Sequence, residues 1–223
     1  VLPMAYCNLQ STTVAGPTIR LDVLQDLFLR HTYIYKGKPI ATPVWEIQPE
    51  KIVLGLPFFG NNFECNNTAP VPFPVHPPGG GPAPICELTR PSDHQMLDHF
   101  ASMQIYNSET VTSGPGIGFD AVKASAWFEY TNKTTHRRHQ VWFEDPRSVR
   151  AKSEFAHTMG MHGVAFWRGN GVYGGRLDRD NVGVDSADAR AMWQAAATAG
   201  HAGGGYGGRG FHAHEISLSL KAN

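Results

Sequence analysis

The sequence predicts an α/β fold with parallel strands. Three short runs, 1–6, 51–59 and 162–167, are mostly apolar and lack the alternation that a half-exposed antiparallel sheet requires. Helical patterns lie between and after these runs, in the order strand, helix, strand, insertion, helix, strand, helix. This order is typical of a parallel sheet covered by helices.

The first helix is predicted over residues 19–31, because its apolar side chains recur at helical spacing. The residues that share this apolar face are Leu21, Leu24, Leu27 and Phe28. Such a face indicates a helix that packs against the sheet on one side.

The two later helices are predicted from their terminal residues. In the segment 145–160, Asp145 suits the N-cap, Pro146 the first helical position and Gly160 the C-terminal stop. The last helix is predicted over 185–200, where Asp185 or Ser186 serves as the cap and Gly200 ends the pattern.

The composition of residues 60–140 differs from that of the flanking segments and predicts an inserted subdomain. The run 71–84 is rich in Pro and Gly and should be irregular. The segments 125–132 and 139–146 predict two strands joined by a polar turn. The aromatic residues expected to fill the core of this subdomain are Trp127, Phe128 and Trp142. The tail 199–223 is dominated by small and polar residues and should not order.

Composition argues against several classes of partner. The 19 basic and 19 acidic residues give a formal net charge of zero, which favours neither nucleic acid nor an acidic membrane surface. No apolar run approaches the roughly 18 to 20 residues of a membrane span. The three cysteines, Cys7, Cys65 and Cys86, have no C-x-x-C spacing, so neither a metal nor another cofactor is expected.

Two features favour the secretory pathway. Cys65 and Cys86 flank the Pro/Gly-rich run, and a disulfide that closes it is predicted. Asn66 and Asn132 begin N-glycosylation sequons in polar, loop-like sequence. Because the sequon pattern is short, the alternative is that either sequon occurs by chance and carries no glycan.

The strand runs "VLPMAY", "KIVLGLPFFG" and "GVAFW", in this order, resemble strands six, seven and eight of the glycoside hydrolase family 18 barrels. The stretch 139–167 is similar to the family sequence before the last strand, above all in chitobiase-type members. The resemblance covers residues 1–197. It implies that the chain is the C-terminal part of a (β/α)8 TIM barrel, about strands six to eight, with an α+β insertion after strand seven.

The resemblance also implies a division of the chain. The expected parts are strands six and seven with the helix between them (1–59), the insertion (60–140), the last barrel helix with strand eight and the C-terminal helix (141–198), and the tail (199–223).

The resemblance implies a glycosidase that cleaves β-1,4 GlcNAc–GlcNAc bonds, in the chitobiose core of N-glycans or in chitooligosaccharides. In this family a Glu protonates the leaving oxygen, and the 2-acetamido carbonyl of the substrate attacks the anomeric carbon with overall retention. The expected partner is an oligosaccharide containing N-acetylglucosamine, and the expected location is the lysosome or the cell exterior. The sequence does not indicate an oligomeric state.

Four residues match positions that contact sugar in the family. Trp167 matches the aromatic residue beneath the sugar, Tyr6 the tyrosine that positions the acetamido group, and Met4 a methionine of the same pocket. Asn170 lies in a loop where chitobiase-type members also carry Asn. The residues alone leave alternatives: Trp167 and Tyr6 could be core side chains, and Asn170 an ordinary loop residue.

The general acid of the family is missing. It ends an Asp-x-x-Asp-x-Asp-x-Glu motif after strand four, and no Glu of this chain has Asp two positions before it. The chain opens on a strand-like run without Met, so we expect strands one to five to belong to a longer parent protein. Three strands leave open edges, and residues 1–223 alone should be poorly soluble and inactive.

The sequence departs from the family pattern at two further positions that matter for function. Cys7 stands where the family usually has Asp, and a thiol is a weak hydrogen-bonding group. Phe59 replaces a hydroxyl-bearing aromatic residue after strand seven. Three hypotheses therefore remain: a fragment of a chitobiase-like hydrolase, a catalytically inactive chitin- or glycan-binding relative, and a chain with no independent function.

Overall fold

The structure is a computed structural model of the 223-residue chain. It describes residues 14–29, 32–35, 38–41, 47–66, 81–88, 94–113, 116–167, 169 and 187–198. The strand predicted at 1–6 and the tail predicted at 199–223 lie outside the described residues, as does most of the Pro/Gly-rich run.

Two of the predicted strands form a parallel pair. β3 (Val53–Pro57) lies beside β10 (Gly163–Trp167), with Val53 opposite Gly163 and Pro57 opposite Trp167. The carboxyl ends of both strands therefore meet at one edge, which confirms the parallel pairing predicted for these two runs.

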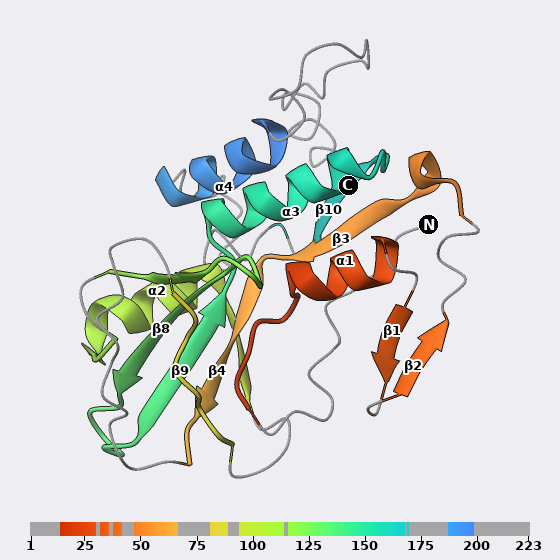
Figure 1. The fold of residues 1–223 in the computed structure, drawn as a ribbon. Coiled ribbons are helices and arrows are strands. Elements are labelled where there is room, and N and C mark those ends of the chain that lie inside the picture. The colour runs from red at the N-terminus through yellow and green to blue at the C-terminus, as the bar shows by residue number, and fades with distance from the viewer. Residues whose placement is uncertain are drawn as a thin grey trace, which may run out of the picture.

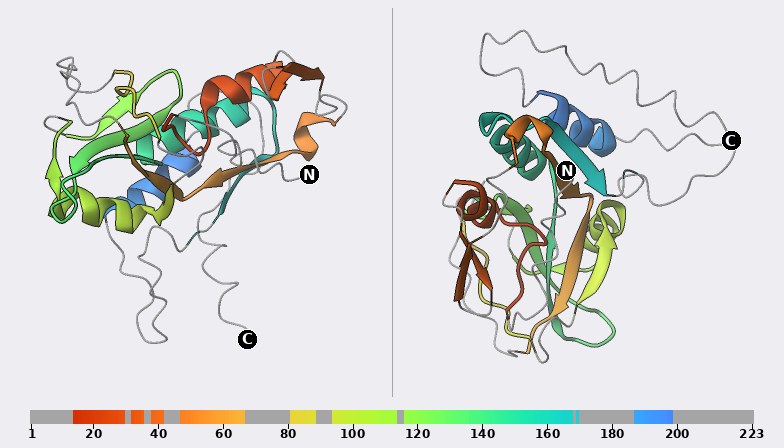
Figure 2. Two further views of the ribbon diagram at one scale, coloured as in Figure 1. Left: turned by 90° about the horizontal axis from the view of Figure 1, so that it is seen from below. Right: turned by 90° about the vertical axis from the view of Figure 1, so that its right-hand side faces the viewer.

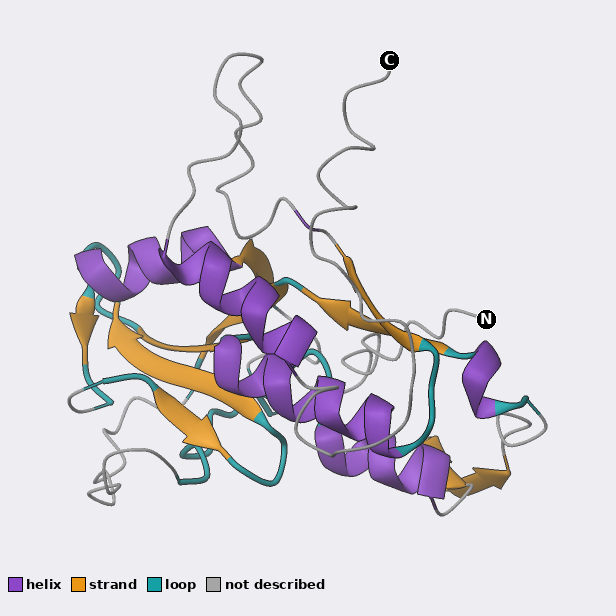
Figure 3. Cartoon of the chain, turned by 90° about the horizontal axis from the view of Figure 1, so that it is seen from above, coloured by secondary structure: helices purple, strands orange, loops and turns teal. Residues whose placement is uncertain are grey.

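Helices cover the parallel pair. α1 (Leu21–Leu29) and α3 (Pro146–Thr158) pack against β3, and α4 (Ala187–Thr198) lies alongside α3 (Figures 1 and 3). The buried side chains at this core include Leu24, Phe28, Leu54, Leu56 and Phe155. None of the helices within the described ranges is both long and apolar enough to cross a membrane.

A second, larger sheet has six strands in the order β5-β4-β9-β8-β6, with β7 also paired to β8. The strands are β4 (Phe59–Glu64), β5 (Gln95–Asp98), β6 (Thr110–Val111), β7 (Gly118–Asp120), β8 (Ser125–Thr131) and β9 (Arg138–Phe143). Figure 2 shows this sheet and the parallel pair as separate parts of the fold joined through β3 and β4. The smaller described elements are the antiparallel pair β1 (Thr32–Tyr35) and β2 (Lys38–Ala41) and a 3-10 turn, Pro49–Lys51.

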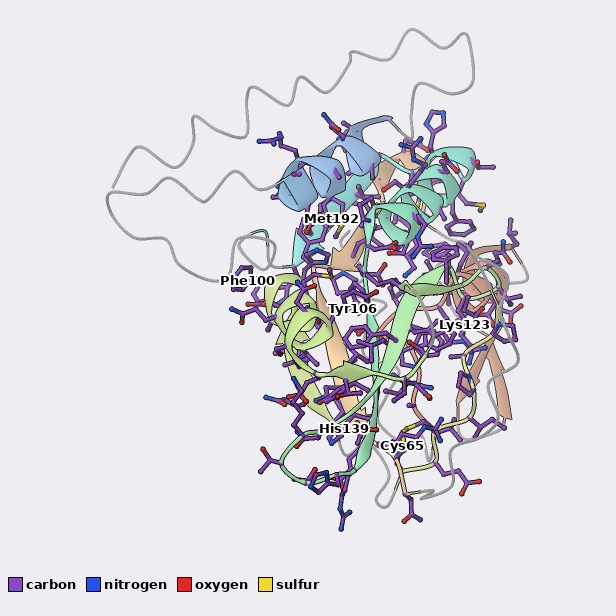
Figure 4. All side chains as sticks on the ribbon, turned by 90° about the vertical axis from the view of Figure 1, so that its left-hand side faces the viewer. Cys65, Phe100, Tyr106, Lys123, His139 and Met192 are labelled. Atoms are coloured by element: carbon purple, nitrogen blue, oxygen red, sulfur yellow. A yellow bond between two sulfur atoms is a disulfide. The ribbon has the colours of Figure 1, made fainter. Side chains whose placement is uncertain are left out.

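The two faces of the six-stranded sheet carry different cores. α2 (His99–Ser108) covers one face, where Tyr106 packs edge-on against Phe128 at 5.3 Å (Figure 4). Trp127 and Trp142 pack on the other face beneath the segment 81–88. All three predicted core aromatics of the insertion are at most 1% exposed, which confirms that prediction.

The region after residue 58 contains structure that the sequence did not predict. The run 51–59 is not one strand, because β3 ends at Pro57 and β4 begins at Phe59. Asn61 and Asn62 have the composition of a turn but lie buried in β4. Asn61 Nδ2 donates to Thr18 Oγ1 at 2.8 Å, and Asn62 Nδ2 donates to Tyr130 Oη at 3.0 Å. These long-range hydrogen bonds allow asparagine inside a strand.

The predicted hairpin and helices are present with adjusted bounds. β8 and β9 form the expected antiparallel hairpin, and the predicted division at 140/141 falls inside β9. The Asp145 side chain accepts from Ser148 N at 2.9 Å at the start of α3, and Gly160 follows that helix with φ +69°. α1 begins at Leu21, two residues later than predicted, and the predicted ends of α4, residues 185–186 and 199–200, lie outside the described residues.

At Gly60 the neighbouring strands β4 and β9 leave no room for a side chain. A Cβ there would lie 2.1 Å from the Trp142 carbonyl oxygen and 2.6 Å from Phe143 Cβ in the neighbouring strand. We expect Gly60→Ala to lower the free energy of unfolding by about 3 kcal/mol, since the paired strands cannot separate. Gly16→Ala is the matched control, because its Cβ would meet nothing within 4 Å. Chemical denaturation of both variants measures the difference, and equal stabilities would contradict the β4–β9 register.

Candidate functional site

The site begins at Trp167, the last residue of β10. Its carbonyl oxygen accepts a hydrogen bond from the Phe58 N–H at 2.8 Å, so the backbone is fixed where the chain passes from β3 to β4. The Trp167 side chain is 60% exposed. A large aromatic ring is thus displayed at the carboxyl end of a parallel strand, the edge where α/β sheets place their sites.

The residue before Trp167 explains why the indole is not in the core. Successive side chains of a strand point to opposite faces, and Phe166 lies on the face toward α4. Its ring stacks on Phe58 at 4.0 Å, and Trp193 of α4 packs edge-on against both rings. This aromatic cluster packs against the end of β10 on the face toward α4. Trp167, the next residue, lies on the opposite face of the strand.

A hollow of ≈ 200 Å³ lies in front of Trp167. Residues of the parallel pair, the six-stranded sheet and α2 line it together: Phe58, Phe59, Met96, Leu97, Asp98, Ala101 and Trp167. The lining is apolar apart from Asp98, and no glutamate is among these described residues. Apolar hollows with few polar groups are typical of small-molecule sites.

Asp98 is both the last residue of β5 and the N-cap of α2. Its Oδ1 accepts a hydrogen bond from Ala101 N at 2.7 Å, and its carbonyl oxygen accepts from Ser102 Oγ at 3.0 Å. Within the described part of the chain, Oδ2 has no hydrogen-bond partner. The hollow therefore contains an acceptor, Asp98 Oδ2, that no described residue uses.

Sequence reasoning identified Trp167 but missed Met96, Asp98 and Ala101. These residues reach the hollow because β5 pairs with β4, with Phe59 opposite Asp98. The available signal was local: Asp before a helical stretch is an N-cap candidate. It predicts the start of α2, but it cannot indicate which surface that helix end faces.

The other predicted sugar contacts fall outside the described residues. Tyr6, Met4 and Asn170 are among them, and so is Cys7. Their roles stay predictions. Phe59, which we expect to replace a hydroxyl-bearing aromatic of the family, lines the hollow and adds an apolar wall there.

The predicted disulfide and sequons lie away from the hollow. The structure joins Cys65 and Cys86 by a disulfide that ties the segment 81–88 to the end of β4 (Figure 4). Asn66 is exposed, and Asn132 begins the turn between β8 and β9, where its Oδ1 accepts from the N–H of Thr134. Glycosylation at both positions stays a prediction.

A buried ion pair lies beneath α3. Lys152 Nζ donates to Glu144 Oε1 at 2.6 Å and to Oε2 at 2.7 Å, and also to Ser125 Oγ at 3.2 Å. Burial raises the pKa of the Glu144 carboxyl and lowers the pKa of the Lys152 ammonium, and their mutual attraction opposes both shifts. Neither side chain lines the hollow, so the pair serves the fold.

The described residues contain no cluster suited to a metal ion. No group of three His, Cys, Asp or Glu side chains within those ranges is placed to hold one.

The chain matches a family model and is similar to several known proteins. The family model described as "Glycosyl hydrolases family 18" matches residues 28–170. Di-N-acetylchitobiase of Rattus norvegicus is 26% identical over 157 residues, which are 67% of this chain and 37% of that protein. A probable di-N-acetylchitobiase 1 of Dictyostelium discoideum is 28% identical over 124 residues, 54% of this chain and 32% of its own length.

Solved structures share this fold over most of the chain. A chitinase from Chromobacterium violaceum superposes with a TM-score of 0.55 at 19% identity, covering 91% of this chain and 45% of the chitinase. The chain thus spans about a third of the curated relatives named here and about half of this structure.

Proposed function

Because the chain belongs to glycosyl hydrolases family 18, we propose that it is part of a chitobiase-type hydrolase that cleaves β-1,4 GlcNAc–GlcNAc bonds. The single observation that carries the proposal is the exposed indole of Trp167 at the carboxyl end of β10, beside an apolar hollow. Aromatic faces of this kind offer a large contact area to the apolar face of a sugar ring.

The proposed position in the fold follows from the same family. Its members have a TIM-barrel-type fold, and we assign β3 and β10 to strands seven and eight of the barrel. The six-stranded sheet is then the insertion after strand seven, and β5 and α2 form a wall beside the barrel end. This assignment is supported by the direct passage from β3 through Phe58 into β4.

The proposed mechanism divides binding from proton transfer. Trp167 supports the sugar from below, Tyr6 and Met4 place the acetamido group, and Asn170 contacts a sugar hydroxyl. The acetamido carbonyl then attacks the anomeric carbon while a glutamic acid protonates the departing oxygen. Residues 1–223 do not supply that acid, because the strand-four motif of the family is not among them.

The second candidate function is binding without cleavage. Cys7 favours it, since a thiol replaces the carboxylate that supports the acid in the family. In this case the protein binds chitin fragments or glycans through Trp167 and leaves them intact.

Binding and cleavage of GlcNAc oligomers test the proposal. Calorimetry on the protein that carries this chain should detect chitobiose and chitotriose, and cello-oligosaccharides with the same linkage but no acetamido group should bind far more weakly. Product analysis then separates the two functions: cleavage supports the hydrolase, and binding with no product supports the glycan-binding alternative. Failure to bind any GlcNAc oligomer would overturn both.

The proposed location is the lysosome or the cell exterior. The disulfide between Cys65 and Cys86 supports it, since such bonds persist in oxidising compartments. The sequon at Asn132 lies in a surface turn, where a glycan has room.

A further inference from the structure

We propose that Asp98 is a positioning residue for the sugar, and that its Oδ2 accepts a hydrogen bond from a hydroxyl or amide N–H of the GlcNAc unit seated against Trp167. The proposal rests on the proposed function, because it takes the hollow to be the oligosaccharide site. Asp98 would add a polar contact from the inserted subdomain, and none of the sugar-contacting residues predicted from the sequence lies in that subdomain.

The two carboxylate oxygens of Asp98 have different surroundings. Oδ1 is held by Ala101 N at 2.7 Å, so the side chain is fixed against the first turn of α2. Oδ2 has no hydrogen-bond partner among the described residues, although Asp98 lines the hollow with Met96 and Trp167. The described residues thus orient this oxygen without donating a hydrogen bond to it.

Capping alone does not require a carboxylate at this position. Ser and Asn cap helices about as well as Asp, and neither of them places a charge beside apolar side chains. The Asp98 carboxylate is only partly exposed beside Leu97 and Met96, so a ligand that displaces water from it must supply a hydrogen-bond donor in its place. A sugar ring carries such donors around an otherwise apolar face, so Trp167 and Asp98 together match both parts of its surface.

The decisive variant is Asp98→Asn. The Asn Oδ1 accepts from Ala101 N as before, but the second oxygen becomes an NH2 group that only donates. We expect chitotriose affinity to fall about tenfold or more by calorimetry, because a hydrogen bond to a charged group is lost. The thermal unfolding temperature should stay at the wild-type value. Asp98→Ser is a second variant with an intact cap, and it should lose affinity similarly.

The outcomes separate this proposal from the proposed function. If wild type binds chitotriose and Asp98→Asn and Asp98→Ser bind equally well, Asp98 is only a helix cap and this inference is wrong, while the proposed function stands. If wild type does not bind, the inference falls with the proposed function. Loss of affinity in both variants with unchanged unfolding supports it, and loss of stability in both would instead assign Asp98 to the fold.

Discussion

Trp167→Ala should lose most of the affinity for GlcNAc oligosaccharides, by about thirtyfold or more. The indole is 60% exposed and stands beside the hollow, so a sugar bound there would cover it. Truncation of a central Trp in a binding site typically removes about 2 kcal/mol or more of binding free energy. Calorimetric titration with chitotriose measures the change.

Two controls make this result specific. Trp167→Phe keeps an aromatic face and should retain part of the affinity. Leu29→Ala removes another exposed apolar side chain, at the end of α1, and should bind like wild type. Because the Trp167 side chain contributes little to the core, its removal should leave the unfolding transition nearly unchanged. Unaltered binding by Trp167→Ala would show that the sugar does not sit on this indole.

The elements predicted correctly are those with strong local signals. Asp145, Pro146 and Gly160 delimit α3 by capping and backbone preference, and these effects do not depend on the rest of the fold. The hairpin of β8 and β9 also follows from two apolar strands and a polar turn. Local physics is sufficient where the partners of a segment are its neighbours in sequence.

The elements that were missed depend on distant partners. Asn61 and Asn62 are stable inside β4 only because Thr18 and Tyr130 satisfy their amides. α2 has no clear apolar face in sequence and buries polar residues such as Ser102. The Asp98 N-cap indicates where α2 begins, but the surface that α2 covers depends on the pairing of β5 with β4.

The same distinction holds for the site. Trp167 was a candidate because it ends an apolar run and matches the aromatic residue of the family. Asp98 and Met96 line the same hollow only through the antiparallel pairing of β5 with β4 and its register, Phe59 opposite Asp98. Pairing of this kind follows from the whole sheet, and a single sequence contains no direct trace of it.

Lys152→Met should destabilise the protein by about 3 to 5 kcal/mol at neutral pH. Lys152 and Glu144 are at most 2% exposed, and the ammonium donates to both carboxylate oxygens. Removal of one partner leaves a buried carboxylate without a counter-charge. Chemical denaturation of the protein that carries this chain measures the loss of unfolding free energy.

The pH dependence of this loss identifies its cause. Burial raises the pKa of Glu144 and Lys152 lowers it, so in Lys152→Met the folded-state pKa moves further above the unfolded value. A group whose folded pKa is raised stabilises the folded state below its unfolded pKa and loses this effect as pH rises through the folded pKa. The difference between variant and wild type should therefore shrink as the pH falls from 7 toward about 5. A constant difference would mean that lost packing, rather than charge, explains the destabilisation.

The double variant Glu144→Leu/Lys152→Met tests whether the unpaired charge causes the loss of stability. It removes both charges together and replaces them with apolar side chains, so no unpaired group remains in the interior. We expect it to recover most of the stability lost by Lys152→Met and to lose the pH dependence. If the double variant is as unstable as the single one, the ion pair is required for its geometry, and the contact of Lys152 with Ser125 becomes the interaction to test. Recovery would instead mean that the apolar packing beneath α3 stabilises this part of the fold without the charges.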